Sequence, residues 1–294
     1  MTDTYLQQVE RVFDTDMIPP LRARIIGPKL FSKNPKVKAK PGQSTVQVTT
    51  LGELGEALIS WGIPQGDVKD MLTATVADKP VPDQSKQYQI PRNVYDAWKA
   101  GLYPIDSAIA ASAGYVVGQK IDEILINGWK PDGTNYAVKG LLQAAGSTKK
   151  GAGFDTYGNA RASVAGLLGV IEGNNALADA YNLLLNPVQW AELLASQSTT
   201  GIEEWDQVLK LLNLGNDSGP AQILSTTHVP AGTGVLSPVD PGRISIEVYE
   251  LQAVENQLTV DPKLGKYSDV YGITAAKVLP HIRQPKAVGK MTDI

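Results

Sequence analysis

The pattern of apolar positions predicts one long amphipathic helix near the middle of the chain. Apolar residues recur at three- and four-residue spacing from Ile105 onwards, and Gly128 follows as a stop. Pro104 favours a helix start, and Asp106 in the first turn suits the helix dipole. At 1.5 Å per residue, a helix over 105–127 is about 34 Å long, which is the width of a small domain. We therefore expect this helix to be the backbone of the fold.

Shorter helices and many strands are predicted on both sides of it. Helical spacing of apolar residues indicates helices over 3–17, 155–172, 188–194 and 203–212. Alternating or short apolar runs indicate strands over 45–50, 181–185, 221–225, 234–237, 243–254, 270–273, 275–279 and 286–288. The strands and helices do not alternate regularly, so the expected fold class is α+β.

A polar stretch with several prolines precedes the long helix. From Gly62 to Pro91 the chain shows no sustained periodicity, and about 30 residues is long for an ordinary loop. Two runs with strand character, 71–76 and 87–90, could pair with each other within it. We therefore expect an extended, two-stranded excursion here.

Charge is distributed unevenly along the 294 residues. The segment Leu21–Thr50 contains seven basic residues and no acid, while the whole chain has a net charge of −3, so the rest carries −10. Such a basic arm fits contact with a polyanion or with an acidic neighbouring subunit. It also fits a solvated loop whose lysines discourage unwanted strand pairing. The basic residues are Arg22, Arg24, Lys29, Lys33, Lys36, Lys38 and Lys40.

The residue types needed for most catalytic and metal sites are scarce. The chain has no cysteine and two histidines, which removes disulfides and thiolates and argues against the usual zinc sites. His228 and His281 have no neighbouring signature of a catalytic triad, so both are expected to be structural. Gly151-Ala-Gly153 misses the dinucleotide-binding spacing and is expected to be a flexible linker. We expect no enzyme activity, no cofactor and no metal.

Two acidic groups are the remaining candidates for chemistry. Glu203, Glu204 and Asp206 form one, and Asp67 with Asp70 forms the other. Paired carboxylates can act as acid and base or hold a divalent ion. On a helix, however, Glu203 and Glu204 would point away from the apolar face, which favours a solvated surface.

Nothing in the sequence indicates contact with a membrane. The N-terminus lacks the basic and then apolar pattern of a signal peptide. The most apolar stretch, 105–117, is too short and too rich in Ala and Ser to span a bilayer. We therefore expect a soluble protein that is intracellular when made.

Several short segments, taken in order, resemble shell proteins of the Hong Kong 97 fold. This family includes the major capsid proteins of tailed viruses and the encapsulins. The resemblance rests on the order and spacing of segments along most of the chain. They are 12–30, Gln89 to Trp98, 105–128 with its ending Ile-Asp-Glu-Ile-Leu-Ile-Asn-Gly, Val138-Lys-Gly-Leu-Leu142, Leu183-Leu-Leu-Asn-Pro187 with Trp190 and Leu193, Tyr271-Gly-Ile-Thr and 281–287.

The resemblance implies self-assembly, through pentamers and hexamers, into an icosahedral shell. The shell would be either a viral capsid that encloses double-stranded DNA or an encapsulin that encloses a cargo enzyme. In the viral case the basic arm would contact the genome or another subunit, and the protein would be found in the virion and, during assembly, in the host cytoplasm. A membrane partner is not implied.

The resemblance also implies a division of the chain. Residues 1–50 would form an N-terminal helix, the basic arm and a first peripheral strand. The extended loop would be 51–91, and the peripheral domain with the long spine helix would be 92–138. An axial domain would cover 139–240, further peripheral strands 241–268, and final axial strands and a tail 269–294.

Overall fold

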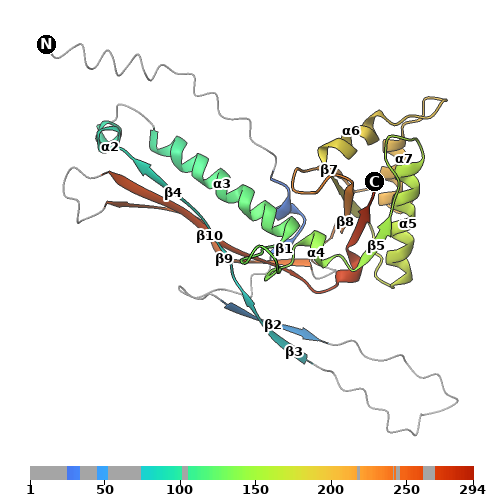
Figure 1. The fold of residues 1–294 in the computed structure, drawn as a ribbon, viewed down its shortest axis with the longest axis horizontal. Helices are drawn as coiled ribbons and strands as arrows, with labels where there is room; N and C mark the ends of the chain where they lie inside the picture. Colours follow the sequence, from blue (N-terminus) through green and yellow to red (C-terminus); the bar gives the residue numbers. More distant parts are fainter. Residues whose placement is uncertain are drawn as a thin grey trace, which may run out of the picture.

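The computed structural model describes residues 25–33, 45–51, 74–100, 105–216, 219–240, 242, 246–260 and 269–294. The predicted helix over 3–17 lies outside these residues. Over these residues the fold is α+β, with one long helix, three sheets and several shorter helices (Figure 1).

The long helix, α3, covers Ile105–Asn127 as predicted and lies along a four-stranded sheet (Figure 1). Val117, Ile121 and Leu125 recur at four-residue spacing and are buried in one cluster with strand residues. Val116, next to Val117 in the sequence, is 41% exposed. Gly128 ends the helix with a φ of +82°.

The four-stranded sheet has the order β1-β9-β10-β4. Its long strands, β9 and β10, form an antiparallel pair, with β4 antiparallel to β10 and the short β1 parallel to β9. A helix, α2, follows β4 and precedes α3. The bounds are β1 Ser32–Lys33, β4 Asp83–Ile90, α2 Arg92–Lys99, β9 Ile246–Val260 and β10 Val270–Ile282.

A second sheet, of order β5-β11-β8-β6-β7, forms the other half of the molecule with α5, α6 and α7 around it (Figure 1). In β6, Leu183 and Leu185 face the cluster under α5 and α7, whereas Leu184 faces the cluster under α3. Burial on both faces explains the continuous apolar run of this strand. The bounds are α4 Leu141–Ala144, β5 Ser147–Lys150, α5 Asn159–Gly173, β6 Tyr181–Leu185, α6 Pro187–Ala195, α7 Glu204–Leu212, β7 Ile223–Ser225, β8 Thr233–Pro238 and β11 Gly289–Thr292.

A two-stranded ribbon projects from the molecule (Figure 1). Strand β2, Thr45–Leu51, pairs antiparallel with β3, Ala74–Pro80. The predicted pairing of 71–76 with 87–90 is therefore wrong. The residues of the second run belong to β4, which pairs with β10 because it can add to a sheet that α3 already covers.

Three predicted elements differ in detail from the structure. Helix α5 begins at Asn159, after Gly158 with a φ of +94°, and not at 155. The predicted break near Thr274 is absent because this residue is buried within the continuous strand β10. The predicted strand over 286–288 falls on a 3-10 turn, η2 (Pro285–Ala287), which precedes β11.

The segment around Gly151 is closely packed, so its prediction as a flexible linker is wrong. The N–H of Gly151 donates to the carbonyl of Thr292 at 2.8 Å. A Cβ on Gly151 would lie 2.9 Å from Oγ of Ser163. The glycine therefore permits close contact between the end of β5 and helix α5.

Candidate functional site

One acidic residue of α7, Glu204, forms a structural contact and does not lie on a solvated face. Glu204 is fully buried, which contradicts the predicted exposed face. Its Oε1 accepts from the N–H of Arg161 at 2.8 Å, and its Oε2 accepts from Oγ of Ser196 at 2.6 Å. Because Arg161 lies in the first turn of α5, Glu204 caps a helix from 43 residues away. Glu203 is exposed, as predicted.

The two histidines occupy separate environments. His228 lies 3.5 Å from Asp122, measured from Nε2 to Oδ2, whereas His281 is buried and its ring stacks on that of Tyr249. Among the described residues, no group of three or more histidines and acids could hold a metal ion. Asp67 and Asp70 lie outside these residues.

Asp122 of α3 binds the end of the N-terminal arm through hydrogen bonds. Its side chain is almost completely buried, and Oδ1 accepts from the N–H groups of Ile26, at 2.9 Å, and of Gly27. These donors begin the 3-10 turn η1 (Gly27–Lys29), where backbone N–H groups have no partner within the turn. A Cβ on Gly27 would lie 2.7 Å from the same oxygen, so only glycine fits.

Burial raises the pKa of Asp122, and the hydrogen bonds from Gly27 and Ile26 and the proximity of His228 partly oppose this shift. His228 belongs to the segment between β7 and β8, so the carboxyl joins the arm, the long helix and the second sheet. A cavity of about 200 Å³ lies beside this junction and includes Ile25, Gln119 and Thr226 in its lining.

The structure describes two of the seven basic arm residues. Lys29 and Lys33 are both exposed, on η1 and β1. The other five lie outside the described residues, so the predicted contact of the arm with DNA or a subunit stays a prediction. They are Arg22, Arg24, Lys36, Lys38 and Lys40.

The base of the ribbon packs on the four-stranded sheet. Val46 of β2 is buried in a small cluster with Val81, Val138, Tyr249 and Leu279. Val46 pairs with Lys79 across the ribbon, so both side chains are on the same face. Because Val46 faces the four-stranded sheet, Lys79 also points towards the sheet at the base of the ribbon.

The environment of Lys79 is basic. Its Nζ lies 3.3 Å from Nδ1 of His281, and burial lowers the pKa of Lys79, assisted by the charge of Lys139. Burial and the nearby charges of Lys79 and Arg283 lower the pKa of His281 to about 4. At neutral pH the histidine is therefore uncharged, and Nδ1 can accept from the ammonium of Lys79.

One acid is part of this group. Glu247 pairs with Arg283, with 2.9 Å between Oε2 and Nη2. Within the described part of the chain, no acid lies within ion-pair distance of Lys79 or Lys139. We call Lys79, Lys139 and Arg283 the cationic cluster.

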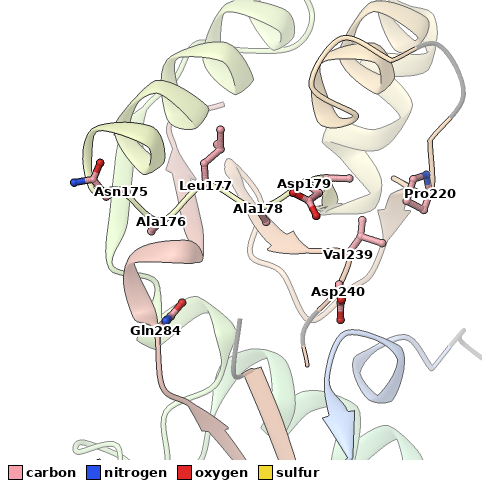
Figure 2. Close-up of a pocket in the computed structure, with 10 residues that line it drawn as sticks. Asn175, Ala176, Leu177, Ala178, Asp179, Pro220, Val239, Asp240 and Gln284 are labelled. Atoms are coloured by element: carbon pink, nitrogen blue, oxygen red, sulfur yellow. The ribbon is translucent and has the colours of Figure 1, made fainter. Parts of the chain in front are cut away.

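A cavity of about 360 Å³ lies beside the loop that leads into β6 (Figure 2). Its lining combines apolar side chains such as Leu177 and Val239 with the carboxyls of Asp179 and Asp240. Gln284 borders it from the end of the other sheet (Figure 2). Among the described residues, the lining has no histidine, lysine or serine.

The sequence reasoning missed Asp122, Lys79 and His281 as contact residues. For Asp122 a signal was present, because it lies with Gly118 and Leu125 on one helical stripe. A small residue and an acid in such a stripe indicate close backbone approach. At Gly118 the neighbour is a side chain, since a Cβ there would lie 2.8 Å from Cδ1 of Ile25. Lys79 and His281 meet across 202 residues, without a local signal.

No helix in the described ranges has both the length and the apolar character to cross a membrane. No protein-family model matches the sequence, and no curated protein matches it. The fold, however, is similar to that of solved shell structures.

Three of these structures span nearly the whole chain. The virus-like particle from Pyrococcus furiosus is 18% identical, with a TM-score of 0.59 and coverage of 92% of both chains. The capsid of Myoviridae phage XM1 is 13% identical, with a TM-score of 0.65 and coverage of 91% of this chain and 90% of the other. The capsid of a native GTA particle is 13% identical, with a TM-score of 0.62 and coverage of 92% and 91%.

These likenesses define the class of fold. The chain has the Hong Kong 97-type fold of capsid shell proteins, as its sequence segments predicted.

Proposed function

We propose that this chain is a structural, non-enzymatic protein whose copies assemble, through pentamers and hexamers, into a closed icosahedral shell. The observation that carries the proposal is the likeness to shell structures over more than nine-tenths of the chain. The ribbon adds support. A two-stranded sheet is marginal by itself, and Val76 on it is 57% exposed. Contact with a second copy would bury it.

We further propose that the shell is a viral capsid around double-stranded DNA, located in the virion and assembled in the host cytoplasm. The support is the charge of the arm, because seven basic residues without an acid can neutralise phosphates. Likeness to a phage capsid is consistent with this function.

An encapsulin that holds a cargo enzyme is the second candidate. The observation that favours it is the likeness to a virus-like particle from a cellular organism, Pyrococcus furiosus. The nature of the enclosed material distinguishes the two functions.

For the domains, we propose the predicted division, changed where the strand pairing departs from it. Strand β10, 270–282, pairs with β9 along nearly its whole length, so it belongs with the peripheral segments 92–138 and 241–268. Strand β11 pairs with β5 and β8 and belongs with the axial segment 139–240. Strand β4, 83–90, pairs with β10 and also belongs with the peripheral segments. Strand β2, 45–51, pairs with β3 and belongs with the extended loop.

The test is electron microscopy of the purified protein, with absorbance at 260 and 280 nm measured on the same nuclease-treated fraction. Closed shells tens of nanometres across are expected for this fold. Protected nucleic acid favours the viral capsid, and protein-filled or empty shells favour the encapsulin. A monomer or dimer that is stable across salt and protein concentration would refute assembly.

A further inference from the structure

A buried histidine holds the ammonium of Lys79 in one position. Nζ of Lys79 lies 3.3 Å from Nδ1 of His281, whose ring is buried and stacks on that of Tyr249. The other ring nitrogen, Nε2, has no hydrogen-bond partner among the described residues, so the bond from Lys79 is the one that this ring makes with them. An ammonium has three donors, and this bond uses one of them. The other two can bind an acceptor that comes from solvent.

The positive charges around Lys79 exceed the negative ones. Lys79 is half-buried, and burial and, next, the charge of Lys139 lower its pKa. Arg283 adds a third cation, which is paired with Glu247 at 2.9 Å. In the described part of the chain neither lysine is within ion-pair distance of an acid, so two positive charges are left over. A half-buried cation is costly unless an anion compensates it.

The packing under the ribbon brings the two lysines to a place that solvent can reach. Val46 and Val138 share a small buried cluster. Lys79 is the cross-strand partner of Val46, and Lys139 follows Val138 in the chain. Lys139 is exposed, so a small ion can approach the cationic cluster from outside. Because folding fixes the backbone of both segments, little further ordering is needed when an ion binds.

The chemistry of these donors favours a small tetrahedral oxyanion. Phosphate or sulfate carries up to two negative charges and so offsets both lysine charges. Its oxygens point in four directions, which lets it accept from ammonium groups on different segments. A carboxylate has one charge and two oxygens. A nucleic-acid backbone has one charge per phosphate and continues on both sides of it, whereas the half-buried Lys79 is best reached by a small ion.

We propose that the cationic cluster binds one tetrahedral oxyanion, inorganic phosphate or sulfate, between the ammonium groups of Lys79 and Lys139. His281 is a positioning residue, because it acts on the ion through Lys79. The bound ion compensates the charge where β3 meets the end of β10, and it thereby stabilises the attachment of the ribbon to the sheet. All of these residues belong to one chain, so the inference does not depend on shell assembly.

The first test is calorimetric titration of the phosphate-free protein with inorganic phosphate and, separately, with sulfate, in a chloride buffer of constant ionic strength. We expect saturable binding of one ion per chain. Lys139→Met should weaken it at least about tenfold, the usual effect of losing one hydrogen bond to a charged group. The matched control is Lys149→Met, which removes an exposed lysine on β5 and should bind like the wild type. Equal affinity in Lys139→Met and the wild type, or no saturable binding, would overturn the inference.

The second test is thermal unfolding, because an ion that binds only the folded chain raises the Tm. Phosphate and sulfate also stabilise proteins in general, by exclusion from their surfaces, so a variant without the site must give the baseline. Lys79→Met keeps a side chain of similar length without the charge. At millimolar phosphate, the wild type and Lys149→Met should gain more in Tm than Lys79→Met, and equal gains in all three would contradict the site.

A third measurement separates the small ion from nucleic acid. A short double-stranded oligonucleotide, matched in phosphate concentration, should not displace bound phosphate from the wild type. If the oligonucleotide binds in a manner that requires Lys139 while phosphate and sulfate do not bind, the cationic cluster contacts a nucleic-acid backbone and the proposal of a small oxyanion is wrong.

Discussion

At the scale of single residues, one carboxyl holds the arm segment in place. Replacing Asp122 by Ala leaves the N–H groups of Ile26 and Gly27 buried without acceptors, which should lower the free energy of unfolding by about 2–4 kcal/mol. Denaturant unfolding measures this loss, and faster trypsin cleavage after Lys29 would report release of the segment. Glu123→Ala is the control, since it removes only an exposed ion pair with Lys120. Equal losses in both variants would contradict the anchoring role.

The buried acid on α7 allows a comparison between adjacent residues. Glu204→Gln keeps the shape of the side chain but removes its charge and replaces one of the two oxygens that accept from Arg161 N–H and Ser196 Oγ by an NH2 group. We expect it to lower the free energy of unfolding by about 1.5–3 kcal/mol, the usual value for a hydrogen bond to a charged group. Glu203→Gln should have no measurable effect, because that side chain is exposed. Chemical denaturation of the two variants measures both free energies of unfolding, and equal values would contradict the structural role of Glu204.

His281 should make the protein sensitive to acid. Its pKa is lowered from 6.5 to about 4 in the folded state, so the unfolded chain binds the proton first as pH falls. The stability from the neutral ring is complete above pH 6.5 and is lost as pH falls towards 4. Between pH 7 and 4.5 the wild type should lose about 2–3 kcal/mol more than His281→Phe, which cannot titrate. Parallel losses in the two proteins would show that another group controls the response.

At the scale of elements, two glycines of the long-helix region respond oppositely to the same substitution. In Gly128→Ala the new Cβ would meet the carbonyl of Val138 and lie 2.7 Å from the nitrogen of Gly140, at a φ of +82°. We expect a loss of more than about 2 kcal/mol. In Gly114→Ala the Cβ meets no atom within 4 Å, so greater helix propensity should stabilise the protein by about 0.5–1 kcal/mol. Thermal unfolding of the unassembled variants tests both signs.

The ends of a helix can be predicted from the sequence when its start and stop residues lie next to it in the chain. Helix α3 has the predicted bounds because its apolar spacing and Gly128 are both local. The Asn186-Pro187 start of α6 is also local, and Asn186 Oδ1 caps it by accepting from Val188 N–H at 3.1 Å. The pairing of β3 was not predictable in this way, because β2 and β4 were both nearby partners and packing on the sheet decided between them.

The candidate contacts were less predictable than the fold. The apolar pattern of α7 predicts a solvated position for Glu204, because that pattern does not contain its partners Arg161 and Ser196, which belong to other segments. Asp122 could have been found from the small residue beside it on the same stripe. Lys79 and His281 depend on long-range register, which no window of the sequence contains.

At the scale of the whole molecule, removing the charge of the arm distinguishes two partners, packaged DNA and an acidic neighbouring subunit. If the arm contacts packaged DNA, replacing its seven basic residues by Gln should leave shells intact but lower their protected nucleic acid, read as the ratio of absorbance at 260 and 280 nm. Each lost phosphate contact should also reduce the salt dependence of DNA binding by about 0.9 in log–log slope. If the arm instead contacts an acidic neighbour, the same substitutions should prevent shell formation.

The control for this experiment must remove equal charge elsewhere. Seven lysines of the body of the protein provide it, namely Lys99, Lys130, Lys149, Lys150, Lys210, Lys286 and Lys290. Because both variants change the net charge from −3 to −10, a general charge effect alters their nucleic acid content equally. A loss confined to the arm variant, with shells preserved, would locate DNA binding in the arm. Wild-type nucleic acid content in the arm variant would contradict that role and favour the encapsulin.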